Sequence, residues 1–195
     1  MFPTEADRAE LQLPTLPPAV LALLGREAAP PRLVAHLTLV HDVCLRLLRQ
    51  LKKTWPKLVF DGHSVAFGAA THDIGKARHP LELAEPGKLH EAEGERLLLE
   101  HGTSPALARF ARTHGASEPL ALPLEDLLVV VADTVWKAKR TKALDDAVAA
   151  AIGVQTGAPA WDVFMKLDGL LERIAASADD RLEWQGRFSV DGGSA

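Results

Sequence analysis

VAFGAATHDIGK, residues 65–76, joins a run of small apolar side chains to an adjacent histidine and aspartate. The small residues 68–70 allow a neighbouring helix to approach closely, which places His72 and Asp73 deep in the molecule. Gly75 supplies the permissive backbone that ends the helix. Since an unpaired buried charge is costly, the stretch predicts a helix end at which metal coordination compensates the aspartate.

Proline and glycine residues divide the rest of the chain into segments of helical periodicity, and no run of alternating β-branched residues suggests a strand. We therefore expect an all-α fold. Besides the helix that leads to His72, the pattern predicts helices over 17–28, 32–53, 90–101, 105–114, 122–139, 141–152 and 160–177, and a long loop over 77–89. The organisation we expect is an N-terminal extension with a short helix (1–30), a helical domain (31–180) and a C-terminal tail (181–195).

The predicted helix over 32–53 carries one apolar stripe, and His36 lies beside it. The same helix contains a second histidine-aspartate pair, His41-Asp42, which serves as a comparison for His72-Asp73. Asp42 can pair with Arg46 four residues later, so we expect the second pair to lie on the surface as an ion pair rather than at a metal.

Composition limits the classes of protein that this chain can represent. With 195 residues and 47% hydrophobic content, it can bury the core of one domain. Its one cysteine, Cys44, excludes an intramolecular disulfide and fits a reducing cytoplasm. The sequence shows no signal-peptide pattern and no apolar run long enough to cross a membrane. The net charge of −4 argues against nonspecific binding to duplex nucleic acid.

Four further side chains, His36, His90, His114 and Asp133, have spacings that suit a metal centre shared with His72-Asp73. Imidazole nitrogen and carboxylate oxygen together favour divalent transition ions such as manganese, iron, cobalt, nickel or zinc. Taken singly, His90 and His114 also fit structural roles at helix ends. Their joint occurrence after the histidine-aspartate pair favours binding of metal or phosphate.

The ordered set of His36, then His72-Asp73-Ile74-Gly75-Lys76, then His90, His114 and Asp133 resembles the HD-domain superfamily of metal-dependent phosphohydrolases. The resemblance covers roughly residues 32–140 and implies an all-helical bundle. It implies a first metal held by His36, His72, Asp73 and Asp133, and a second held by His90 and His114 with Asp73 bridging. The Gly-Tyr-Pro segment of one cyclic-dinucleotide branch is absent, and Gly115 follows His114 where that branch has another histidine. Two metals are therefore expected rather than three.

The reaction that the resemblance implies is hydrolysis of a phosphate ester, of a nucleotide or cyclic nucleotide, by a metal-activated water. Asp73 and Lys76 are the catalytic candidates, and Lys76 would offset phosphate charge unless it simply closes the loop on the surface. Lys137 and Arg140 belong to a basic run that is either a second substrate contact or a solvated helix end. Trp136 can stack a base or serve only in packing.

Two other functions remain open at the level of sequence. Some members of the superfamily hold two irons with the same histidine-carboxylate set and cleave a carbon bond with dioxygen. A signalling module that binds a nucleotide without hydrolysing it is the second alternative. The partner we expect is a small-molecule phosphate substrate such as a nucleotide, and not a membrane.

Overall fold

The computed structural model describes residues 1–116 and 118–191, which form helices joined by turns, with no strand among them. The α-helices are α1 (Glu5–Glu10), α2 (Pro18–Arg26), α3 (Pro31–Thr54), α4 (Gly62–Thr71), α5 (Leu89–Glu100), α6 (Pro105–Ala108), α7 (Phe110–Thr113), α8 (Leu124–Val135), α9 (Lys142–Thr156), α10 (Ala160–Ala175) and α11 (Ala178–Gly186). The 3-10 helices are η1 (Ile74–Ala77), η2 (Pro80–Leu83) and η3 (Pro119–Ala121). The predicted all-α fold is confirmed.

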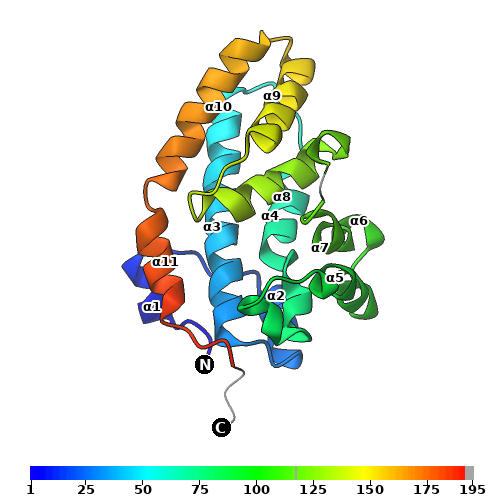
Figure 1. Ribbon diagram of the computed structural model, residues 1–195, viewed down its shortest axis with the longest axis vertical. Helices are drawn as coiled ribbons and strands as arrows, with labels where there is room; N and C mark the ends of the chain where they lie inside the picture. The colour runs from blue at the N-terminus through cyan, green and yellow to red at the C-terminus, as the bar shows by residue number, and fades with distance from the viewer. Residues whose placement is uncertain (117, 192–195) are drawn as a thin grey trace.

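Helix α3 runs along the centre of the molecule, and other helices surround it (Figure 1). It begins after Pro30 with Pro31 in the first turn, a position where the missing N–H costs nothing. Every residue from Leu33 to Cys44 is buried, whereas the sequence predicts a single apolar stripe. The difference arises because α4, α8, α10 and α11 all pack against α3.

Helix α4 approaches its neighbours closely, as its small residues predict. A Cβ atom on Gly68 would lie 2.6 Å from Cγ of Phe110 and 2.9 Å from Cγ2 of Val129. The adjacent Ala69 and Ala70 belong to two different hydrophobic clusters, a large one around α3, α8, α9 and α10 and a smaller one around α2 and α5. The end of α4 therefore brings its polar residues to the boundary between the two clusters.

The second histidine-aspartate pair is buried, and the expectation of a surface position is wrong. Only 6% of His41 and 5% of Asp42 is exposed. The predicted ion pair is present, with Nε of Arg46 2.7 Å from Oδ2 of Asp42. The Nδ1–H of His41 donates to the carbonyl oxygen of Ala66 at 3.0 Å, so α4 covers this face of α3.

Two helices at the ends of the chain are not predicted from the sequence. A capping box starts α1, in which Thr4 and Asp7 bond each other's backbone N–H. Helix α11 packs beside α1 (Figure 1), and the indole N–H of its buried Trp184 donates to the carbonyl oxygen of Asp7. The first residues of the expected tail 181–195 therefore belong to α11. The last residues of the tail, 192–195, lie outside the described residues.

Other predicted helix boundaries also differ from the structure, and α9 continues to Thr156 where the sequence predicts an end at 152. The segment predicted as one helix over 105–114 is divided at Arg109 into α6 and α7. Helix α8 ends at Val135 rather than at 139, because Ala138 adopts a left-handed conformation with φ of 54°. Among the described residues, no helix has the length and apolar character that a bilayer crossing requires.

Candidate metal centre

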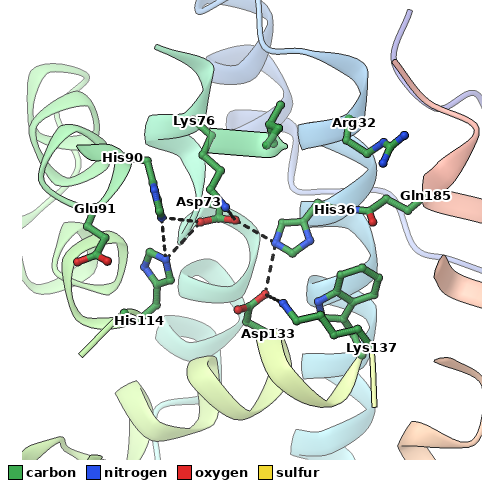
Figure 2. A pocket seen from close by; sticks show the side chains of 13 residues that line it. Arg32, His36, Asp73, Lys76, His90, Glu91, His114, Asp133, Lys137 and Gln185 are labelled. Carbon is green, nitrogen blue, oxygen red and sulfur yellow. Dashed lines mark hydrogen bonds and ion pairs between the residues drawn. The ribbon is translucent and has the colours of Figure 1, made fainter. Parts of the chain in front are cut away.

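The structure brings the six predicted ligands together at the boundary between the two hydrophobic clusters. They are His36 in α3, His72 and Asp73 directly after α4, His90 in the first turn of α5, His114 directly after α7, and Asp133 in the last turn of α8. Figure 2 shows Asp73 between the rings of His90 and His114 on one side and that of His36 on the other. Five segments that are distant in the sequence thus meet at one site around Asp73.

Three of these residues, His36, His72 and Asp133, form a first group of donors able to hold one metal ion. The Nε2 atoms of His36 and His72 lie 3.2 Å apart. Oδ1 of Asp133 lies 3.4 Å from Nε2 of His36 and 3.5 Å from Nε2 of His72. Two nitrogens and one oxygen therefore face a common point.

The other three residues, Asp73, His90 and His114, form a second group. Oδ1 of Asp73 lies 3.1 Å from Nε2 of His90 and 3.2 Å from Nε2 of His114. The second carboxylate oxygen of Asp73, Oδ2, lies 3.1 Å from Nε2 of His36 in the first group. Asp73 thus offers one oxygen to each group, which is the arrangement of a bridging carboxylate.

A close backbone contact holds His90 next to Asp73. A Cβ atom on Gly75 would lie 2.1 Å from the carbonyl oxygen of His90 and 2.6 Å from the backbone nitrogen of Gly94. Only glycine therefore allows η1 to lie directly against α5 at this distance. The glycine of the His-Asp-Ile-Gly-Lys motif thus brings the second group of donors together. It does not end the helix as the sequence predicts, because α4 already ends at Thr71 and Gly75 lies within η1.

Backbone and side-chain acceptors set the tautomers of three of the four histidines. Nδ1 of His72 lies 3.1 Å from the carbonyl oxygen of Ala69, and Nδ1 of His114 lies 2.9 Å from that of Ala111. A carbonyl oxygen can only accept, so each Nδ1 carries the proton and, in the neutral ring, each Nε2 presents a lone pair to the centre.

Glu82 performs the same role for His90. Its Oε2 lies 2.5 Å from Nδ1 of His90, and its two oxygens also accept from the backbone N–H groups of His90 and Leu89. A carboxylate behind a ligating imidazole fixes the orientation of the ring. Glu82 was not identified from the sequence, because it lies in the predicted loop 77–89 and its spacing shows no relation to His90.

A divalent cation fits this donor set. Oδ1 of Asp73 is buried and forms no hydrogen bond with any described residue, although two ring nitrogens lie within 3.2 Å of it. A carboxylate oxygen and imidazole lone pairs are all acceptors, so their convergence is unfavourable without a cation between them. Mixed nitrogen and oxygen donors suit a transition ion better than magnesium.

The histidines of the site keep its two carboxylates ionised. Burial alone would raise the pKa of Asp73, but the surrounding histidines His72, His114, His36 and His90 outweigh it and hold the pKa well below its usual range. The pKa of Asp133 is likewise held well below its usual range, because His36 and His72 outweigh the effect of burial. Both carboxylates are therefore ionised at neutral pH and available to a cation.

Five of the six side chains, all except the fully buried His72, border a cavity of about 400 Å³. Three cationic side chains also line it, those of Arg32, Lys76 and Lys137. Nζ of Lys76 lies 2.7 Å from Oδ2 of Asp73, and Nζ of Lys137 lies 3.5 Å from Oδ1 of Asp133 (Figure 2). The charged lining of the cavity thus combines these three cations with the carboxylates of Asp73, Asp133 and Glu91.

Other candidates from the sequence lie differently. Arg140 is not among the residues that line the cavity, and its guanidinium pairs with Asp145 at 2.7 Å and Asp168 at 2.8 Å. We therefore do not place it in the site. Trp136 is a packing residue that also lines the cavity. It is only 3% exposed and packs edge-on against His36, with ring centroids 5.3 Å apart.

Arg32 lines the cavity and was not predicted from the sequence. Its Nε donates to the carbonyl oxygen of Phe188 at 2.7 Å, and its Nη2 donates to that of Gly186 at 3.0 Å. These bonds hold the end of α11 at the cavity, where Gln185 also contributes a side chain (Figure 2). Because both partners are more than 150 residues away, no local pattern identifies this contact.

Comparison with known protein families agrees with the geometry. The family model described as HD domain matches residues 33–135, which is more than half of the chain. The protein therefore belongs to the HD domain family, whose members are mostly metal-dependent hydrolases. Comparisons with curated proteins and with solved structures give no match.

Proposed function

We propose that the protein is a metal-dependent phosphohydrolase that cleaves a phosphate ester of a nucleotide or cyclic nucleotide. The observation that carries the proposal is the bridging position of Asp73, with one oxygen toward His36 and the other toward His90 and His114, at a cavity that also holds lysines. This arrangement suits a pair of divalent ions. Such a pair, when bound, lowers the pKa of a water molecule and neutralises charge on a phosphoryl oxygen.

The side chains of the protein supply two further requirements of phosphate-ester hydrolysis, which are binding of the anion and orientation of the ligands. Lys76 and Lys137, with 18% and 25% of their side chains exposed, can each turn an ammonium group toward a phosphate without leaving the cavity. Glu82 keeps the proton of His90 on Nδ1 and the ring oriented. The chain thus orients the reacting groups and attracts an anion.

The size and walls of the cavity favour a single nucleotide. About 400 Å³ lies near the lower end of the range of small-molecule sites and suits one base, one sugar and one or two phosphates. Trp136 and Leu83 provide apolar wall, while the lysines lie beside the carboxylates. A substrate with one apolar and one anionic end matches this distribution.

The test is hydrolysis by protein loaded separately with Mn²⁺, Fe²⁺, Co²⁺, Ni²⁺ or Zn²⁺. The substrates are mono- and bis(nitrophenyl) phosphate, nucleoside monophosphates and cyclic nucleotides. We expect hydrolysis with at least one metal and its loss in Asp73→Ala. Asp162→Ala, which removes an exposed carboxylate of α10 that does not line the cavity, should retain full activity. Absence of hydrolysis in every combination, or an unaffected Asp73→Ala, would overturn the proposal.

The same assays separate the two other functions. An oxygenase that uses two irons would consume dioxygen with an organic substrate and would not release phosphate. A nucleotide-binding module would bind nucleotide without hydrolysing it in any of the five metals. Either result replaces phosphohydrolysis as the function.

A further inference from the structure

A second cavity, of about 300 Å³, lies between α3, α10 and α11. Four arginines line it, Arg46, Arg49, Arg173 and Arg181. No aspartate or glutamate is among its lining residues, and it shares none of these residues with the cavity at the metal centre. The protein as a whole is acidic, so four guanidinium groups around one cavity make a marked local concentration of positive charge.

Arg181 is the buried member of this group and is only 4% exposed. Its Nη1 donates to the carbonyl oxygen of Ile174 at 2.8 Å and to that of Trp136 at 3.3 Å. No carboxylate of the described residues lies within 4 Å of its guanidinium. Burial lowers the pKa of Arg181, and the more distant carboxylates of Asp42 and Asp180 only partly offset this effect. The charge of Arg181 is therefore incompletely compensated by the protein itself.

The other three arginines do not supply that compensation. Arg46 pairs with Asp42, with Nε and Oδ2 2.7 Å apart. Arg49 and Arg173 are exposed, and neither has a carboxylate within 4 Å among residues 1–116 and 118–191. Three guanidinium groups thus border the cavity without a direct counter-charge. Like charges held together are unfavourable, and an anion in the cavity removes this cost.

We propose that this cavity is a binding site for a small phosphorylated anion that carries a pyrophosphate group. Guanidinium groups bind phosphate oxygens through paired hydrogen bonds, and several of them around one cavity favour more than one phosphate. The side chains of Gln50 and Ser177 also line the cavity and add neutral hydrogen-bonding groups. The site is separate from the metal centre, although Arg181 bonds the backbone of Trp136, whose ring lines the cavity at the metal centre.

The test is calorimetric titration of pyrophosphate into chelator-treated protein, because removal of metal prevents hydrolysis and metal-dependent binding. Arg49→Ala/Arg173→Ala removes two exposed side chains, so the fold should be retained, which circular dichroism checks. Each charge-assisted hydrogen bond contributes enough that we expect binding to weaken by at least about tenfold. Lys53→Ala/Lys57→Ala removes the same charge from exposed positions outside the cavity and should bind like wild type.

The double variant Lys76→Ala/Lys137→Ala tests whether pyrophosphate binds instead in the cavity at the metal centre. We expect this variant to retain pyrophosphate binding. The proposal is overturned if the wild-type protein does not bind pyrophosphate, if the paired arginine and Lys53/Lys57 variants weaken binding equally, or if only the Lys76/Lys137 variant loses it.

Discussion

Glu82 and His90 are joined by a contact of 2.5 Å between Oε2 and Nδ1, and this contact makes a loop carboxylate part of the candidate metal centre. The contact keeps the proton of His90 on Nδ1. The other ring nitrogen, Nε2, therefore faces Oδ1 of Asp73 at 3.1 Å. The second group of donors therefore depends on a residue that binds no metal itself.

Replacing Glu82 should weaken the second metal site selectively. Glu82→Gln keeps the shape of the side chain but removes its charge, and we expect the affinity for the second ion to fall by about 10- to 100-fold. Titration of Mn²⁺ into chelator-treated protein should then show one tight site where wild type shows two. Glu85→Gln changes an exposed carboxylate of the same loop and should leave both sites intact. Two unchanged sites in Glu82→Gln would contradict the role given to this residue.

The sequence predicts the six candidate ligands from their order along the chain and the family resemblance that this order carries, and only some of them have a local signal of their own. His72-Asp73 ends a small-residue helix, and Asp133 follows an apolar run that makes an unpartnered carboxylate costly. Glu82 has no such signal, because η2 brings it to His90 only in the folded chain. Arg140 was predicted as a substrate contact because it belongs to a basic run. The sequence does not reveal that Asp168, 28 residues later, pairs with Arg140 in the folded chain.

Element boundaries depend on tertiary contacts in the same way. The apolar stripe of α3 predicts one buried face, yet residues from Leu33 to Cys44 are buried on every side because helices surround them. Helix α11 has few apolar residues and gives only a weak periodic signal. It is held by the burial of Trp184 against α1 at the other end of the chain.

Replacing Gly75 should destabilise the fold at the metal centre. The added methyl group of Gly75→Ala would overlap the backbone of α5, because its Cβ would lie 2.1 Å from the carbonyl oxygen of His90. Overpacking of this kind costs about 1–3 kcal/mol and can cost more where backbone must move. Urea unfolding of chelator-treated protein measures the change. Gly25→Ala is the control, since no atom lies within 4 Å of its added Cβ, and it should not destabilise the protein.

Burial of His41 predicts a dependence of stability on pH. Burial lowers its pKa, and the hydrogen bond to Ala66 and the charge of Asp42 only partly oppose this effect. The unfolded chain therefore binds a proton near pH 6.5, while the folded protein binds it only at lower pH. Folding stability contributed by this residue falls as pH decreases below about 6.5, by at most about 1.4 kcal/mol per pH unit.

His41→Gln keeps a donor for the carbonyl oxygen of Ala66 but does not titrate. The free energy of unfolding should therefore decrease less between pH 8 and pH 5 in His41→Gln than in wild type, when both are measured by urea unfolding. His63→Gln changes an exposed histidine and should show the wild-type dependence. If His41→Gln and wild type lose the same free energy over this range, the buried ring does not contribute to it.

Lys76 and Lys137 should contribute to substrate binding rather than to metal binding. Their ammonium groups lie beside Asp73 and Asp133, and both line the cavity at the metal centre. Loss of one charge-assisted hydrogen bond to phosphate costs about 1.5–3 kcal/mol, so Lys76→Ala should lower kcat/KM by about 10- to 150-fold. Metal content, measured by mass spectrometry, should not change. Lys88→Ala removes an exposed lysine outside the cavity and should keep wild-type kinetics. A full loss of metal in Lys76→Ala would show instead that Lys76 holds the metal ligands in position.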